Sequence, residues 1–268
     1  MNCETLVVNH NAGFFSCYTI RLQNILSFFN KNKKCPEKVD SSNQFLDYKV
    51  NKNKDYTHEY IKLNESLHIE YSCDIKLTNK DGDEQFSNYT DLNLQEIRPF
   101  IDKFFSPSDT ILKIVFDMEK RYSLDYKNLA VFYYRGTDKN IETNLCEYET
   151  FIEKAKQVRR DNIHIKFLIV SDEIALINLF RDTFEDVIVF NELLNNMSRS
   201  FIHSQIMLAS VLIMSKAEHI ICTSGNVSLW IILFRGRNGN IYQYLSPKEY
   251  IYGVKNKDFD IHKKSFWI

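Results

Sequence analysis

The chain has 268 residues, enough for one large domain or for two smaller domains that each bury a core. Its 34 Lys and Arg residues nearly balance its 35 Asp and Glu residues, which leaves a formal net charge of -1 at pH 7. This balance excludes a global attraction to nucleic acid or to anionic membranes, so any anion site must be local.

The cysteines and the N-terminal residues indicate the cellular compartment of the protein. The six cysteines include no Cys-x-x-Cys pair, which argues against a zinc site or a disulfide framework. Residues 1–16 lack the basic and apolar regions of a signal peptide, and no apolar run reaches the roughly eighteen residues that span a bilayer. We therefore expect a cytoplasmic protein without a membrane span.

The N-terminal stretch predicts the opening of a βαβ unit. Residues 5–8 form an apolar run typical of a strand, and a helical period starts at Tyr18. His10, Asn11 and Gly13 lie in the turn between them, where Gly13 would let the backbone approach a ligand and the helix start would offer N–H groups. These three residues are candidate ligand contacts. The alternative is a tight turn without a ligand, and His10 taken alone fits a structural role better.

Residues 31–90 are polar and irregular, with short β-like pieces at 68–71 and 75–77. Asp81 and Asp83 flank a glycine in the Asp-x-Asp pattern by which metal-dependent transferases hold a divalent cation. Because this pair lies among polar residues at a Gly turn and not after a buried strand, a hairpin turn is the favoured interpretation. We expect no metal site.

Two helices are predicted next, at residues 92–105 and 110–122, from their apolar spacing. The second follows Ser-Pro-Ser-Asp at residues 106–109, a strong helix-start signal. We place the boundary between an N-terminal lobe, residues 1–115, and a C-terminal lobe, residues 116–268, in this region.

From residue 129 onward, strand-like and helix-like segments alternate. Near-continuous apolar strands that alternate with helices predict an α/β protein with a parallel, doubly wound sheet. The predicted strands are residues 129–134, 163–170, 186–190, 219–222 and 241–244, and the predicted helices are residues 146–158, 173–182, 201–214 and 227–234.

Polar residues gather directly after the strand at 129–134. Ligands of open α/β sheets bind outside the carboxyl ends of the strands, so an arginine there is well placed to meet a diphosphate. The alternative is an ordinary strand exit with solvated charges. The residues concerned are Arg135, Thr137, Asp138, Lys139 and Glu142.

Two further strand ends carry candidate residues. Asp172 follows the strand at 163–170 and could contact a base or ribose. A run of four residues precedes the helix at 227–234, where hydroxyls and free N–H groups could cradle a phosphate. This run is Thr223, Ser224, Gly225 and Asn226. Alternatively, Ser224 or Asn226 merely caps the helix, and both roles are compatible.

Three of these segments carry a family resemblance. Arg-Gly-Thr-Asp-Lys at 135–139 resembles the Arg-Arg-Thr-Asp-Lys run of the α1,6-fucosyltransferases and the nodulation fucosyltransferases. Residues 167–173 resemble that family's strand ending in a Thr/Ser-Asp pair, and residues 215–223 resemble its strand ending in Cys-Thr. The order and spacing of the three motifs agree with the family across residues 125–236, and residues 10–16 show a weaker similarity.

The resemblance implies a GT-B type fold with two Rossmann-like lobes, the N-terminal one on the acceptor side and the C-terminal one binding a nucleotide sugar. It implies transfer of fucose from GDP-fucose to a glycan or other hydroxyl acceptor, with inversion and without a metal or other cofactor. The alternative is a non-catalytic nucleotide- or glycan-binding relative of the same fold.

A metal-free transfer needs positive charge on the leaving diphosphate and a base for the acceptor hydroxyl. The paired N–H donors of the Arg135 guanidinium suit the phosphate oxygens, and Lys139 could add a second positive charge. Asp138 or Glu142 is the candidate base.

The chain departs from the family pattern at three positions. The resemblance places the acidic base at Thr143 and a second arginine at Gly136, and neither residue type is present there. Ser210 stands where the family carries an Asp that contacts guanine, and a serine would discriminate bases less well. GDP is therefore implied by similarity alone.

Overall fold

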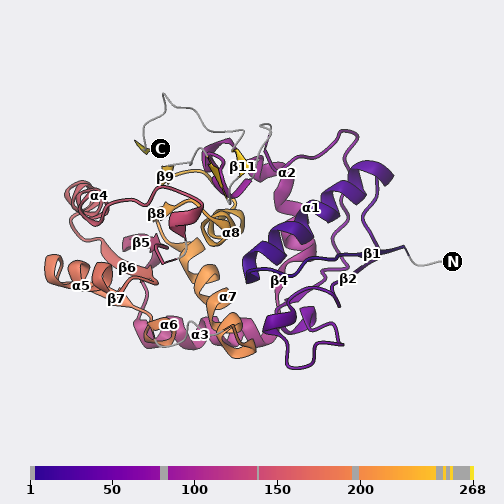
Figure 1. The fold of residues 1–268 in the computed structure, drawn as a ribbon, viewed down its shortest axis with the longest axis horizontal. Coiled ribbons are helices and arrows are strands. Elements are labelled where there is room, and N and C mark those ends of the chain that lie inside the picture. Colours follow the sequence, from indigo (N-terminus) through magenta and orange to yellow (C-terminus); the bar gives the residue numbers. More distant parts are fainter. Residues whose placement is uncertain are drawn as a thin grey trace.

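The computed structural model describes residues 4–78, 84–137, 139–194, 199–245, 250–251, 254–255 and 266–268. They form a C-terminal α/β part and a smaller N-terminal part beside it (Figure 1). No helix within these residues is both long and apolar enough to cross a lipid bilayer.

The C-terminal part is built on a six-stranded sheet with the order β12-β9-β8-β5-β6-β7. Its five central strands run parallel, and β12 pairs antiparallel with β9. All five predicted strands form, so the predicted doubly wound sheet is confirmed. The strands are β5 (Leu129–Tyr134), β6 (Lys166–Ser171), β7 (Val187–Val189), β8 (His219–Thr223), β9 (Ile241–Leu245) and β12 (Phe266–Trp267).

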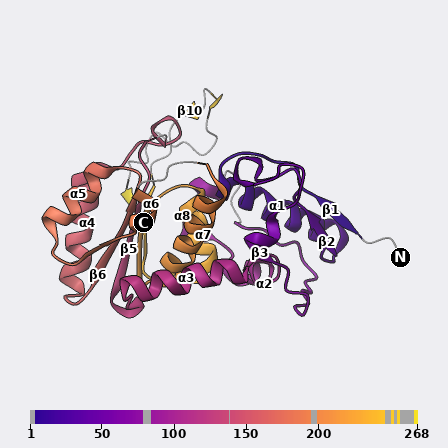
Figure 2. The ribbon, with the colours of Figure 1, turned by 90° about the horizontal axis from the view of Figure 1, so that it is seen from below.

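Helices cover both faces of this sheet (Figure 2). One face carries α4 (Tyr148–Asp161) and α5 (Ile174–Thr183), and the other carries α3 (Asp109–Tyr122), α7 (Phe201–Lys216) and α8 (Asn226–Arg235). The single-turn helix α6 (Asn191–Leu194) precedes α7, and the short pair β10 (Tyr250–Ile251) and β11 (Val254–Lys255) follows β9. Each predicted helix of this part forms within a few residues of its expected bounds.

The alternating side chains of β5 explain why a continuous apolar run makes a strand here. All six side chains are buried, because successive residues point to opposite faces and both faces are covered. Leu129, Val131 and Tyr133 join one apolar cluster, and Ala130, Phe132 and Tyr134 join the other.

The N-terminal part contains the predicted βαβ unit. Strands β1 (Thr5–Val7) and β2 (Lys38–Asp40) pair in parallel, with α1 (Phe14–Asn32) between them. The helix begins at Phe14, one turn before the expected period at Tyr18. Between β2 and residue 94, the described residues include four short 3-10 turns, η1 (Leu46–Tyr48), η2 (Thr57–Glu59), η3 (Glu84–Phe86) and η4 (Tyr89–Asp91).

The strands expected at residues 68–71 and 75–77 do not form. At the second piece, Asn30 of α1 takes the place of a partner strand: Ile75 donates its N–H to Asn30 Oδ1 and accepts from Asn30 Nδ2, both at 2.8 Å. The sheet pairing of this region lies elsewhere, between the two-residue strands β3 (Ile61–Lys62) and β4 (Ser106–Pro107).

Helices α2 (Leu94–Phe104) and α3 confirm the two predicted helices at their place between the two parts. Ser108 caps α3 as its sequence indicates, with Oγ accepting the Ile111 N–H at 3.3 Å. Two further 3-10 turns, η5 (Tyr126–Asn128) and η6 (Lys139–Ile141), flank β5.

A shared apolar core joins the two parts. The ring of Trp230 on α8 lies 5.0 Å from Tyr18 on α1 and 4.7 Å from Phe105, which follows α2. The predicted lobe boundary between residues 115 and 116 falls within α3. The division into an acceptor lobe and a donor lobe stays a prediction.

Candidate active site

The strand order of the sheet reverses between β5 and β8, and we call the carboxyl-end edge of the sheet at this point the crevice. The chain continues from β5 to β6 and β7 on one side, and β8 and β9 then fill the other side. Such a reversal of strand order is where open α/β sheets bind ligands, at the carboxyl ends of the strands. Arg135 follows β5 and Thr223 ends β8, so the two best candidate segments meet at this point.

Arg135 and Thr223 are in direct contact. The Arg135 backbone N–H donates to Thr223 Oγ1 at 3.4 Å, and the arginine side chain is half-buried. Both residues line a cavity of about 10 Å³, together with Thr143, Cys146 and Ser224. That volume holds about one water molecule. Burial raises the pKa of the Cys146 thiol to about 12, so this thiol is neutral and no nucleophile.

Asp172 holds the loop that follows Arg135. Its two carboxylate oxygens accept the backbone N–H groups of Gly136, at 2.8 Å, and Thr137, at 3.3 Å. The residue predicted to contact a base or ribose therefore fixes the conformation of the loop that carries the candidate cations.

Gly136 stands where the family resemblance places a second arginine, and the structure leaves no room for a side chain. A Cβ there would lie 2.5 Å from Glu173 Oε1 and 2.9 Å from Tyr134 Cε1. Glu173 also accepts a hydrogen bond from the Tyr148 hydroxyl at 3.2 Å. The departure from the family pattern is thus matched by neighbours that fill the space.

Lys139 is buried close to the start of α8. Its ammonium forms an ion pair with Glu142, and both side chains are nearly nine-tenths buried. It also donates to Gln85 Oε1 at 3.3 Å and lies 5.5 Å from the centre of the Phe86 ring. A Cβ at Gly225 would lie 3.4 Å from Lys139 Cε, an ordinary contact distance, so the lysine side chain passes directly beside this glycine. The structure therefore brings the predicted Lys139, Glu142 and Gly225 together.

The start of α8 is covered by the segment around Tyr89. The fully buried Tyr89 hydroxyl accepts the Gly225 N–H at 3.0 Å and donates to the Gln85 carbonyl at 2.9 Å. Asn226 donates to Gln85 Oε1 at 3.0 Å and accepts from Thr19 of α1 at 2.7 Å. The N-cap of α8 is Gly225 and makes no side-chain cap bond, so neither Ser224 nor Asn226 is the cap.

Ser224 faces β9 instead of the helix that it precedes. Its hydroxyl donates to the Tyr244 carbonyl at 3.4 Å and accepts from Gln243 Nε2 at 2.9 Å. Gln243 also donates to the Ser87 carbonyl at 2.9 Å and accepts the Tyr89 N–H at 2.9 Å. Gln243 thereby ties the Tyr89 segment to the sheet.

The N-terminal candidates lie around the start of α1. His10 Nε2 and Ser16 Oγ are hydrogen-bonded at 3.0 Å, and burial lowers the pKa of His10. Asn11 Oδ1 accepts the Leu46 N–H at 2.9 Å, while Gly13 precedes the first turn of α1 and has open space where a Cβ would stand. His10 and Asn11 thus have structural partners, and contacts to a ligand stay a prediction.

Two positions set by the family resemblance are inside the protein. Ser210 is fully buried in α7 and donates to the Ile206 carbonyl at 2.9 Å. Thr143 is buried, and its hydroxyl contacts the Lys139 carbonyl at 3.4 Å. The structure does not bring Ser210 to the strand ends, so a contact to guanine has no support from its position.

Asp138 and the pair Asp81 and Asp83 lie outside the described residues. Within the residues that are described, no group of three His, Cys, Asp or Glu side chains is arranged to hold a metal ion. Metal independence stays a prediction.

Several residues of this cluster had no signal in the sequence. Gln85, Tyr89, Gln243 and Thr19 come from segments far away along the chain, and none belongs to a motif. Tyr89 and Gly225 are separated by 136 positions, so no local pattern could have paired them.

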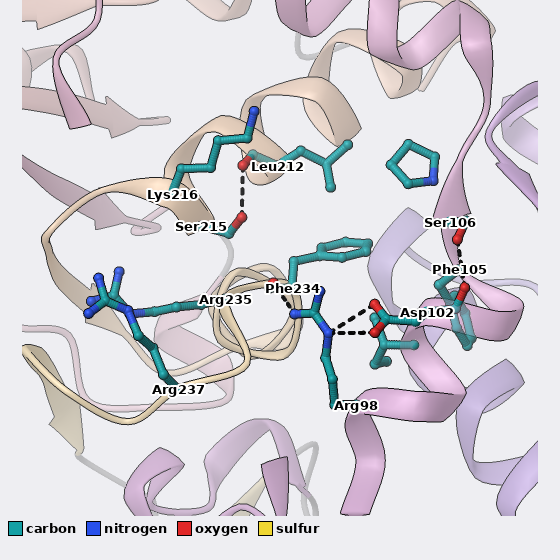
Figure 3. A pocket seen from close by; sticks show the side chains of 12 residues that line it. Arg98, Asp102, Phe105, Ser106, Leu212, Ser215, Lys216, Phe234, Arg235 and Arg237 are labelled. Carbon is teal, nitrogen blue, oxygen red and sulfur yellow. Dashed lines mark hydrogen bonds and ion pairs between the residues drawn. The ribbon is translucent and has the colours of Figure 1, made fainter. Parts of the chain in front are cut away.

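A larger cavity, of about 450 Å³, lies at the other end of α8 (Figure 3). It is lined by Phe105, Leu212 and four cations, which have their own partners. Arg98 pairs with Asp102 and donates to the Phe234 carbonyl at 3.0 Å, as Figure 3 shows. Lys216 pairs with Glu119, Arg237 pairs with Glu218, and Arg235 donates to the carbonyls of Ala217, Glu218 and Gly239.

The ten residues of α8 separate that cavity from Asn226 by about 15 Å, given a rise of about 1.5 Å per residue. The cavity is therefore separate from the strand-end site. Three of its four cations already face carboxylates.

The doubly wound sheet, the crevice at its reversal point and the flanking N-terminal part define a GT-B-like α/β protein. Its fold is similar to that of NodZ α-1,6-fucosyltransferase. The NodZ structure co-crystallised with GDP matches with a TM-score of 0.61 and 10% sequence identity over 91% of this chain and 96% of that chain. The NodZ structure soaked with GDP-fucose matches with a TM-score of 0.59 and 9% identity over 90% of this chain and 94% of that chain.

The fucosyltransferase NodZ from Bradyrhizobium gives a TM-score of 0.58 at 9% identity, over 91% of this chain and 96% of that chain. No family model and no curated protein matches the sequence. At identities of about a tenth, the likeness establishes the fold alone. The resemblance inferred from three short motifs is thus confirmed at the level of the fold.

Proposed function

We propose that this chain is a glycosyltransferase that moves a sugar, fucose from GDP-fucose, to the hydroxyl of a glycan or another acceptor, with inversion and without a metal ion. One observation carries the proposal: the candidate cations Arg135 and Lys139 converge with the start of α8 at the crevice between β5 and β8. A fold similar to that of NodZ, which was co-crystallised with GDP, supports a nucleotide-sugar donor at this crevice.

In the proposed reaction, the acceptor oxygen attacks the anomeric carbon as the bond from that carbon to the diphosphate oxygen breaks. The diphosphate leaves with the bonding electrons, and its growing charge needs positive partners. Arg135 would contact it through its two-pronged guanidinium and Lys139 through its ammonium. Glu142 and the Phe86 ring both contact the Lys139 ammonium, which supports this proposed role.

The acceptor hydroxyl must lose its proton to a base, and Asp138 and Glu142 are the candidates. Glu142 already holds Lys139. We propose to separate them by Asp138→Asn and Glu142→Gln: loss of sugar transfer with intact GDP binding identifies the base. Loss of GDP binding in Glu142→Gln would instead show that Glu142 acts by holding Lys139.

The N-terminal part would carry the acceptor. Residues 31–90 are polar and mostly irregular, which suits a variable binding surface. Substitutions at exposed positions there should change acceptor choice while sparing GDP affinity, and a screen of hydroxyl acceptors tests this. A cytoplasmic location is part of the proposal and rests on the cysteine pattern of the sequence.

A second candidate function is a nucleotide- or glycan-binding protein without transfer activity. It is favoured by the filled space at Gly136 and by the partners of Asp172, Glu173 and Glu142, which each hold another group. Calorimetric titration with GDP, UDP and GDP-fucose, combined with an assay for GDP release, distinguishes the two. GDP release supports transfer or hydrolysis, and GDP binding without turnover supports the second candidate. No nucleotide binding contradicts both the transferase and a nucleotide-binding protein, and leaves glycan binding alone.

A further inference from the structure

The side chain of Gln85 lies where the proposed donor would place its charge. Its Oε1 atom accepts a hydrogen bond from Lys139 Nζ at 3.3 Å and another from Asn226 Nδ2 at 3.0 Å. The two donors come from opposite sides of the crevice, one after β5 and one at the start of α8. A single oxygen atom therefore joins the buried ammonium to the first residue of the helix.

The surroundings of this oxygen suit an anion better than an amide. Lys139 supplies a positive charge, which its ion pair with Glu142 balances in part, and the first turn of α8 supplies the positive end of a helix dipole. A phosphate oxygen would form a charge-assisted bond with the ammonium, which is stronger than the bond to a neutral amide oxygen. The amide oxygen thus occupies a position in which a charged oxygen would be more stable.

The backbone around Gln85 is held in place by its neighbours. Tyr89 is fully buried and bonds to Gly225, Gln243 holds the backbone of Ser87 and Tyr89, and Glu84 accepts from Gln23 at 2.6 Å. A rotation of the Gln85 side chain would free the site without moving η3 or η4. After such a rotation, Lys139 would keep its ion pair with Glu142.

We propose that the Gln85 carboxamide is an internal placeholder for a diphosphate oxygen, which occupies the donor site until a nucleoside diphosphate displaces it. The inference rests on the proposed function, since it regulates the same site. The placeholder keeps the buried Lys139 paired in the empty protein and weakens donor binding by the free energy needed to displace it. Binding of the donor exchanges one acceptor oxygen for another, so hydrogen bonds are replaced and no covalent bond is formed or broken.

Two substitutions of Gln85 should act in opposite directions. Gln85→Ala removes the competing oxygen and should tighten the binding of GDP and of inorganic pyrophosphate about three- to ten-fold, in proportion to one or two hydrogen bonds that no longer need to be broken. Gln85→Glu places a carboxylate beside Lys139 and should weaken both ligands about ten-fold or more. Calorimetric titration at one fixed salt concentration measures all of these affinities.

Gln157→Ala is the matched control, because exposed Gln157 on α4 also accepts a hydrogen bond from a lysine, Lys154 at 3.0 Å. It should bind GDP as the natural protein does. Melting temperatures of all variants show whether each is folded.

Accessibility of Lys139 gives a second readout that does not depend on GDP. Acetylation by acetic anhydride, followed by peptide mass spectrometry, should modify Lys139 faster in Gln85→Ala than in the natural protein. GDP binding that is weaker in a folded Gln85→Ala, or equal in both Gln85 variants, would overturn the placeholder and leave the donor proposal standing. Absence of GDP and pyrophosphate binding in all proteins would contradict the donor proposal and the placeholder together.

Discussion

The Asp172 carboxylate after β6 accepts the backbone N–H of Gly136 after β5 at 2.8 Å, so one strand end fixes the loop of its neighbour. The same carboxylate accepts the Thr137 N–H. Arg135 and Lys139 stand on either side of this anchored stretch. The position of both candidate cations therefore depends on a carboxylate that need not touch the ligand.

Asp172→Ala should destabilise the protein by about 1 to 3 kcal/mol, because two backbone donors lose their acceptor in a partly buried loop. Asp172→Asn keeps one acceptor oxygen and should lose about half as much. Urea unfolding measures both, with exposed Asp182→Ala as a control that should stay within about 0.5 kcal/mol. An Asp172→Ala protein as stable as the natural one would show that the loop does not need this anchor.

Gly136→Ala should cost about 1 to 3 kcal/mol, because the new Cβ would lie within 3 Å of Glu173 and Tyr134. Glu173 can turn away at the expense of its bond from Tyr148, so the double variant Gly136→Ala, Glu173→Ala should recover part of the loss. Thermal unfolding of both single variants and the double variant measures the coupling. Strictly additive effects would contradict the proposed clash.

The sheet and its helices could be predicted because the signal was local. Strands such as β5 are continuous apolar runs, and Ser108 caps α3 as its sequence context indicates. The strand ends then placed Arg135, Asp172 and Thr223 at one edge, since parallel strands deliver their carboxyl ends together.

The remainder of the site depends on contacts between distant segments. The irregular stretch before α2 holds Gln85 and Tyr89, whose partners Lys139, Gly225 and Asn226 lie far along the chain. Neither periodicity nor a motif marks such contacts. A short motif also could not show that the Glu173 side chain lies where a side chain of residue 136 would stand. That contact depends on how the loops after β5 and β6 face each other.

Acidification should destabilise the protein through its buried histidines. Burial lowers the pKa of His219 and of His203 below the ordinary value of 6.5, and Nδ1 of each is buried without a partner among the described residues. The folded state therefore binds fewer protons than the unfolded state, so stability is present above about pH 6.5 and falls as the pH drops through the unfolded-state value.

Melting temperatures of the natural protein and of His219→Gln at pH 7.5 and 5.5 test this. The variant should lose less stability between the two pH values, whereas exposed His68→Gln should behave as the natural protein does. An equal pH dependence of stability in His219→Gln and the natural protein would show that His219 does not contribute to the acid destabilisation.

Donor binding and sugar transfer should survive EDTA, because positive charge on the diphosphate would come from Arg135 and Lys139. GDP titration and the GDP-release assay in the presence and absence of excess EDTA measure this. Restoration of lost activity by manganese, but not by calcium, would contradict a metal-free reaction.

The central claim is that Arg135 meets the diphosphate of the donor. Arg135→Ala should then weaken GDP binding or slow transfer by roughly thirty- to a thousand-fold, because it removes a charge-assisted pair of hydrogen bonds valued at roughly 2 to 4 kcal/mol. Arg135→Lys restores the charge without the two-pronged geometry and should recover only part of the loss. Exposed Arg181→Ala is the matched control and should bind GDP normally.

The most direct test is the GDP affinity of Arg135→Ala measured together with its melting temperature. We predict a large loss of GDP affinity and a melting temperature close to that of the natural protein. Unchanged GDP affinity would contradict it by removing Arg135 from the donor site, and lost affinity with a collapsed melting temperature would show a structural role instead.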